Sequence, residues 1–165
     1  MKRFINMTII LIFTQFTQAT VIKYSFNNLD SGNFEYVYTI TNDTLTVPIE
    51  QLTIWFDQQF YNNLQIVFQP HLANDFDEII LPATGLGVPL GYDVLAISGG
   101  INIGQSVSGF SIRFNWLGDG LPGTQHYEII VPATNHTIDS GFTIPEPATL
   151  LLLSLSFVIN KGVRE

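Results

Sequence analysis

The stretch Asn33–Asn42, which reads N-F-E-Y-V-Y-T-I-T-N, decides the fold class, because its apolar side chains recur at every second position. Side chains of a strand point alternately to the two faces of a sheet, so a period of two predicts a strand with one buried face. Half-buried strands of this kind are typical of antiparallel sheets. The apolar face carries Phe34, Tyr36, Tyr38 and Ile40, and the other face carries Glu35, Val37, Thr39 and Thr41.

Short segments of the same character occur along most of the chain, separated by turns rich in Gly, Pro, Asn and Asp. Gly109–Leu117 alternates in the same way and has Trp116 on its apolar face, so we expect Trp116 in the core. Helical periodicity is not sustained anywhere. The pattern predicts an all-β fold, a single antiparallel β-sandwich of about seven to nine strands. The other expected strands are Val21–Asn27, Pro48–Asp57, Leu64–Phe68, Glu78–Leu81, Tyr92–Ser98 and Gln125–Val131. Two further segments, Ile101–Ile103 and Thr137–Ile144, are candidates for additional strands.

Trp55 breaks the alternation of its own segment. Leu52, Ile54 and Phe56 share one face of Pro48–Asp57, which places Trp55 on the opposite, polar face. An exposed tryptophan on a sheet is a candidate platform for sugar stacking or for a protein partner. The alternative is that a loop, or the segment Gln58–Asn63, covers the ring.

The N-terminus has the three parts of a secretory signal peptide. Lys2 and Arg3 are followed by the largely apolar run Phe4–Phe13, and Thr17-Gln18-Ala19 has the small-x-Ala form of a signal peptidase site. We therefore expect a signal peptide over residues 1–19, export by the Sec machinery, and cleavage between Ala19 and Thr20.

The C-terminal segment 144–165 combines a proline-flanked glutamate, an apolar run and a basic end. Pro145-Glu146-Pro147 precedes Ala148–Ile159, and Lys161 and Arg164 follow. A helix over about 148–163 would be a short membrane span, because a bilayer core calls for about 20 residues. The basic residues would keep that end cytoplasmic and place the rest of the chain outside.

This order of elements resembles a PEP-CTERM sorting signal, read by an exosortase. The resemblance implies a Gram-negative exported protein, first held in the inner membrane and later at the cell surface, in the outer envelope or in the extracellular matrix. It also implies exosortase as a partner and an association with exopolysaccharide and biofilm. The alternatives are an ordinary short anchor and a GPI signal, although a GPI tail ends apolar.

The middle of the chain, residues 20–143, is similar to the β-sandwich ectodomains that precede this signal. The residues that carry the likeness are Phe34–Asn42, Pro48–Phe56 and Ser108–Phe114. The resemblance implies an immunoglobulin-like topology and no particular activity.

Charge and cysteine content exclude several classes of function. Residues 20–143 contain twelve acidic residues and the two basic residues Lys23 and Arg113, a formal charge of −10. Such a surface repels nucleic acid. The chain has no cysteine, so it has no disulfide, thiolate metal site or cysteine nucleophile.

The sequence contains no recognisable catalytic motif. It lacks G-x-S-x-G, and His71, His126 and His136 do not have the spacing of a zinc site. The acidic residues Asp75, Asp77 and Glu78 could bind calcium with help from Asp119, but the alternative is a solvated acidic loop. We expect no catalytic residues, and no cofactor other than this weak calcium candidate.

Three functions remain open. The first is a non-enzymatic surface or matrix protein associated with exopolysaccharide. The second is a carbohydrate-binding or adhesin module that uses Trp55. The third is a hydrolase with an unrecognised site, which would require a cleft with convergent polar groups.

Overall fold

The computed structural model describes residues 20–30, 32–85 and 87–146, which form ten strands and no helix. The proposed signal peptide, the apolar run after Glu146, Pro147 and the basic residues Lys161 and Arg164 all lie outside these residues. Within the described ranges, no helix could span a membrane. The strands are β1 (Val21–Asp30), β2 (Asn33–Thr41), β3 (Gln51–Phe56), β4 (Tyr61–Ile66), β5 (Phe76–Leu81), β6 (Leu90–Ala96), β7 (Ser106–Trp116), β8 (His126–Val131), β9 (His136–Phe142) and β10 (Ile144–Pro145).

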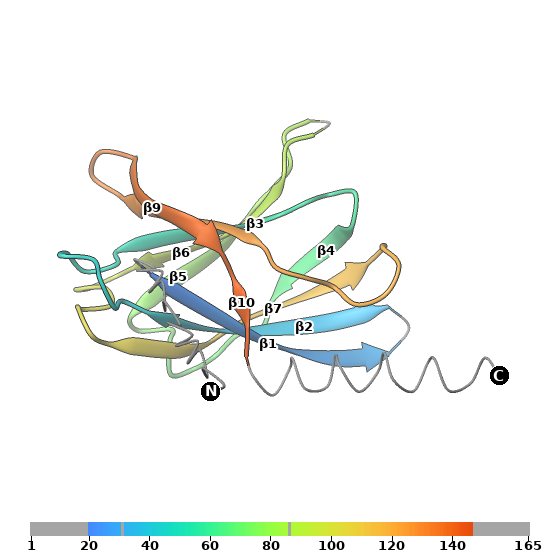
Figure 1. Ribbon diagram of the computed structural model, residues 1–165, viewed down its shortest axis with the longest axis horizontal. Coiled ribbons are helices and arrows are strands. Elements are labelled where there is room, and N and C mark those ends of the chain that lie inside the picture. Colours follow the sequence, from blue (N-terminus) through green and yellow to red (C-terminus); the bar gives the residue numbers. More distant parts are fainter. Residues whose placement is uncertain (1–19, 31, 86, 147–165) are drawn as a thin grey trace, which may run out of the picture.

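The all-β sandwich is confirmed. One sheet has the order β10-β1-β2-β7-β4 and the other the order β5-β6-β3-β8-β9 (Figure 1). All neighbours pair antiparallel except β1 and β10, which are parallel. The expected strand count of seven to nine was too low. In contrast, the candidate strand Ile101–Ile103 is only an isolated bridge, from Ile101 to Ile49.

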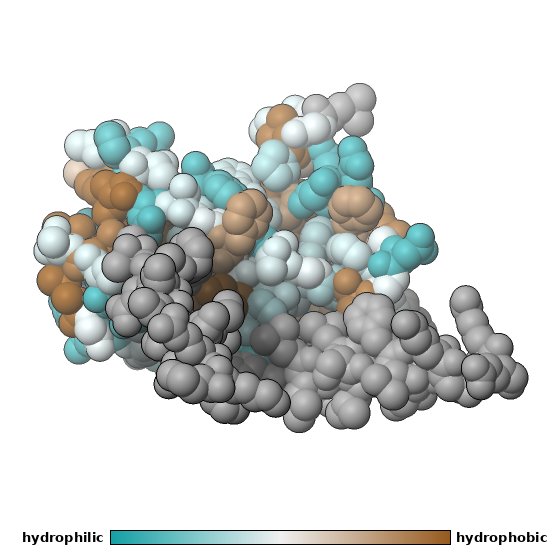
Figure 2. Space-filling model, viewed as in Figure 1, coloured by the Kyte–Doolittle hydropathy of each residue, from teal (hydrophilic) through white to brown (hydrophobic). Residues whose placement is uncertain are grey.

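β2 has the alternation that its sequence predicts. Its four apolar side chains are buried and the intervening residues are only partly buried. β2 lies between β1 and β7, so its inner face reaches the core of the sandwich. There Tyr36 contacts Tyr24 and Phe114, with ring centroids 4.8 Å apart in both pairs. Figure 2 shows that hydrophobic residues also reach the surface, notably in the region of β9.

Several tyrosines are buried in the core, and the hydroxyl of each needs a hydrogen-bond partner. Tyr36 donates to the carbonyl of Gly123 at 2.7 Å. Tyr38 donates to Oε1 of Gln125 at 3.1 Å, and Nε2 of Gln125 donates to the hydroxyl of Tyr61 at 3.1 Å. The segment before β8 therefore supplies partners for side chains of β2 and β4.

Gln125 also fixes the segment that leads into β10. Its backbone N–H donates to Oγ1 of Thr143 at 2.9 Å, and the Thr143 hydroxyl donates to Oε1 of Gln125 at 3.1 Å. Both residues are almost fully buried, with exposed fractions of 2% and 1%. The buried amide of Gln125 thus connects strands of the first sheet to the end of the second.

Strand β10 contains residues that the sequence analysis assigned to the sorting signal. Ile144 and Pro145 pair with Lys23 and Tyr24 of β1, and the N–H of Glu146 donates to the carbonyl of Tyr24 at 2.8 Å. The described fold therefore continues past residue 143, and the first two residues of the Pro-Glu-Pro triplet lie against the edge of a sheet.

Replacing Gln125 by leucine should lower the free energy of unfolding by about 3 kcal/mol, because the substitution leaves the buried hydroxyls of Tyr38 and Thr143 without their acceptor. Urea denaturation followed by circular dichroism measures the difference. Gln65→Leu is the matched control, since the side chain of Gln65 is exposed on β4 and its amide donates to Asn63, which is exposed as well. A loss at Gln125 no larger than at Gln65 would show that the network does not stabilise the fold.

Candidate functional site

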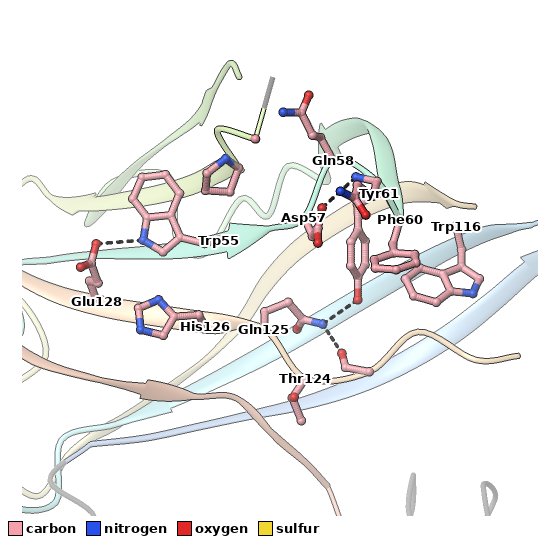
Figure 3. Close-up of a pocket in the computed structure, with 14 residues that line it drawn as sticks. Trp55, Asp57, Gln58, Phe60, Tyr61, Trp116, Thr124, Gln125, His126 and Glu128 are labelled. Carbon is pink, nitrogen blue, oxygen red and sulfur yellow. Dashed lines mark hydrogen bonds between the residues drawn. The ribbon is translucent and has the colours of Figure 1, made fainter. Parts of the chain in front are cut away.

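A groove of about 830 Å³ opens where three connections meet at one end of the sandwich (Figure 3). Its walls come from the β3–β4 turn, the β5–β6 connection and the β7–β8 connection. Both tryptophans of the chain line it. Between them lie amide, carboxylate, hydroxyl and imidazole side chains. The full lining is Trp55, Asp57, Gln58, Gln59, Phe60, Tyr61, Gly87, Pro89, Trp116, Gly123, Thr124, Gln125, His126 and Glu128.

Trp55 lies on the outer face of β3, as its phase in the sequence predicts. The ring is half-buried, and its Nε1 donates to Oε2 of Glu128 on β8 at 2.9 Å. The opposite residue on β6 is Gly91, where an added Cβ would lie only 3.0 Å from Cζ3 of Trp55. A glycine at position 91 therefore makes room for the indole, which is held between two neighbouring strands.

Trp116 lies at the other end of the groove, within an aromatic cluster. It is partly buried and packs against the core, so the expectation that it lies in the core is met only in part. Its ring centroid is 4.9 Å from that of Tyr61. Phe60, which is 43% exposed, covers it with a centroid distance of 5.6 Å. The indole nitrogen of Trp116 is buried, and no hydrogen-bond partner for it exists among the described residues.

The floor of the groove is the buried Gln125 network. Figure 3 shows Gln125 and Tyr61 between the two tryptophans, joined by a hydrogen bond. Burial raises the pKa of Tyr61 above its usual value, so its hydroxyl stays protonated at neutral pH. The floor is therefore made of buried, uncharged polar groups that bond to one another.

The rim is held by bonds between loops. Nε2 of Gln58 donates to the carbonyls of Gly85 and Val88, both at 2.9 Å, and so ties the β5–β6 connection to the β3–β4 turn. Oδ1 of Asp57 accepts the N–H of Gln59 at 2.9 Å within the turn. Two loops that are distant in sequence thus form one wall.

The acidic residues proposed for calcium do not converge. Asp77 is exposed on β5, whereas the next residue, Glu78, points to the opposite face and accepts a hydrogen bond from Tyr92. Asp75 precedes the strand, and Asp119 is exposed in the β7–β8 connection. Across residues 20–30, 32–85 and 87–146, no three His, Asp or Glu side chains form a group that could hold a metal.

Of the three histidines, only His126 lines the groove. His71 lies 3.2 Å from the carbonyl of Ser108, and His136 is exposed at the start of β9. His126 and Glu128 were not singled out as binding residues from the sequence. The alternation in H-Y-E-I-I-V could have indicated them, because it places His126 and Glu128 on the face of the strand away from the buried Tyr127 and Ile129. The sequence of β8 by itself does not indicate that this strand pairs with β3.

No protein-family model matches the chain, and no curated protein matches it. Among solved structures, it is similar to the chitin-binding domain of Chi18aC from Streptomyces coelicolor, with 16% identity and a TM-score of 0.42 over 66% of this chain and 90% of that one. Two structures of a GH20 exo β-N-acetylglucosaminidase from Vibrio harveyi match at 10% identity, with TM-scores of 0.41 and 0.40. These matches cover 79% of this chain but 18% of the enzyme. Likeness at this level says nothing about a ligand or an activity.

Glu78→Gln should raise the melting temperature at pH 7 and leave it unchanged near pH 3. Burial raises the pKa of Glu78 above its ordinary value of 4.5. The stability that its protonated form contributes is therefore fully present below pH 4.5 and is lost as the pH rises through the folded-state pKa. Glutamine lacks this ionisation and can still accept the bond from Tyr92.

Thermal denaturation across a pH series tests this expectation. Asp77→Asn is the matched control, because it removes the neighbouring charge from the exposed face of the same strand. If the two variants gave the same pH profile, the effect would come from net charge and not from the burial of Glu78.

Proposed function

We propose that the groove binds carbohydrate and that the protein is a non-catalytic binding module. The observation that carries the proposal is that both tryptophans line one groove with polar side chains between them. Sugar rings have apolar C–H faces that pack on aromatic rings and hydroxyls that bond to carboxylates and amides. Trp55, Phe60 and Trp116 supply the rings, and Asp57, Gln58 and Glu128 supply the polar groups.

The side chains of the groove are held in place by contacts within the protein, which supports a binding role. Glu128 fixes the indole of Trp55, Phe60 packs on Trp116, and Gln58 ties two loops together. Side chains that are held in place lose less conformational entropy on binding, so more of the contact energy contributes to affinity.

The groove also meets the geometric condition set for a hydrolase, since polar groups converge in it. Its two carboxylates, however, have structural partners. Glu128 accepts the bond from the Trp55 indole, and the carboxylate of Asp57 accepts the backbone N–H of Gln59 within the β3–β4 turn. We therefore favour binding over catalysis.

We further propose that this binding takes place outside the cell, and that an N-terminal signal peptide and a C-terminal sorting signal bring the protein there. The support is the order of sequence elements: an expected signal peptide over 1–19 and the triplet Pro145-Glu146-Pro147 before an apolar run and a basic end. An exosortase would be the processing partner, and surface or matrix exopolysaccharide the ligand source. Because Pro145 pairs with β1, access to the triplet would require β10 to detach from the sheet.

Trp55→Ala should weaken binding to the glycan that the protein recognises by about tenfold or more, since it removes a stacking surface. A glycan array identifies the ligand, and titration followed by tryptophan fluorescence measures the affinity. The chain has only two tryptophans and both line the groove, so the fluorescence reports on this site alone. Affinity electrophoresis serves for the variants.

Phe68→Ala is the matched control for this experiment. Phe68 is 69% exposed and does not line the groove, so its loss should leave affinity unchanged. Equal affinity of the Trp55→Ala variant and the unmodified protein would remove Trp55 from the site. An absence of any glycan ligand would overturn the proposed function.

Replacing Pro145, Glu146 and Pro147 by alanine should leave a full-length, membrane-retained form in a host that has an exosortase. Immunoblots of membrane and surface fractions measure retention, and mass spectrometry identifies the C-terminus. The same host without its exosortase is the control. Unchanged release and maturation of the alanine variant would show that the triplet is not a sorting signal.

A further inference from the structure

A row of residues crosses the outer face of the sheet β5-β6-β3-β8-β9 at the level of Trp55. The strand registers place Leu81 opposite Gly91, Gly91 opposite Trp55, Trp55 opposite His126, and His126 opposite Phe142. Trp55 and His126 also line the groove. The row is therefore continuous with the groove and leads away from it towards β9.

The β9 end of the row is an exposed aromatic surface. Phe142 is 65% exposed, and its ring lies 5.5 Å from that of His126 at an interplanar angle of 71°. Neighbouring strands are about 4.8 Å apart, so the row from Trp55 to Phe142 is about 10 Å long. Figure 2 shows hydrophobic surface in the region of β9. The chain thus displays rings on three successive strands, β3, β8 and β9.

The charged residues of this sheet restrict the class of ligand that could bind along the row. Its strands carry no lysine or arginine. Strand alternation places the carboxylates of Asp77, Asp93 and Glu128 on the outer face, where Asp93 is buried, whereas Glu78 and Asp139 point to the inner face. In the described part of the chain, the only lysine and arginine are Lys23 on β1 and Arg113 on β7, both in the other sheet. Arg113 is moreover paired with Glu35 at 2.7 Å. A polyanionic ligand would meet carboxylates here, including Asp57 and Glu128 in the groove, and neither a lysine nor an arginine.

We propose that an uncharged polysaccharide chain occupies the groove and the row together, in contact with Trp55, His126 and Phe142. The inference rests on the proposed function and adds the class of ligand and its path. A mono- or disaccharide fills only the groove, whereas a longer chain also reaches Phe142. Polyuronates are disfavoured, because the path offers carboxylates and neither a lysine nor an arginine.

The test compares soluble neutral polysaccharides (glucans, mannans, xylans and galactans) with polygalacturonate and alginate by affinity electrophoresis. We expect retardation by a neutral polymer and none by the polyuronates. Phe142→Ala should weaken binding of that polymer by about threefold to tenfold, the range typical of one aromatic contact. It should not change binding of the matching disaccharide. Phe68→Ala should change neither.

The outcomes separate this inference from the proposed function. If Trp55→Ala weakens binding while Phe142→Ala affects neither polymer nor disaccharide, the groove binds sugar and the extended path is wrong. Binding of polyuronates as tight as that of neutral polymers would overturn the ligand class alone. If no polysaccharide of either kind is bound, both proposals fail. Because Phe142 is exposed, an unchanged melting temperature will show that its variant is folded.

Discussion

The buried amide of Gln125 is the interaction on which the rest of the structure depends. It bonds to the hydroxyls of Tyr38, Tyr61 and Thr143, and thereby connects β2 and β4 of one sheet to the chain on both sides of β8 and β9. Unpaired, these groups would each cost free energy in the interior. The same network is the floor of the groove, so the constraint that fixes how the two sheets pack also fixes the base of the site.

The two faces of the sheet β5-β6-β3-β8-β9 differ in what they contact: the inner face packs in the core, and the outer face borders the groove. Its inner face supplies core residues such as Ile54 and Ile129, whereas Trp55 and Glu128 point outward and bond to each other. The outer face is not simply solvated, because Thr53 and Asp93 are buried there and share a hydrogen bond. These strands have no lysine or arginine that could pair with an anion, and the exposed ring of Phe142 adds apolar contact area.

Much of the fold could be predicted from the sequence because strand alternation is a local property. The buried face of β2, the outward position of Trp55 and the core packing of Trp116 all follow from it. The same alternation argues against a metal site that uses Asp77 and Glu78 together, because adjacent residues of a strand point to opposite faces of the sheet. The strand count was less accurate, because β10 depends on pairing with β1, which lies at the far end of the sequence.

The sequence by itself determined the class of fold, the inner and outer faces of the main strands and the acidic character of the surface, because each is a property of neighbouring residues or of composition. Only the tertiary structure decided that Trp55 and Trp116, 61 positions apart, line one groove, and that His126 and Phe142 continue from it. The physical reason is that strand order and register are set by packing and pairing between distant segments. The alternation of Asn33–Asn42 predicts that the strand has a buried face, but it does not predict which strands pair with it or pack against that face.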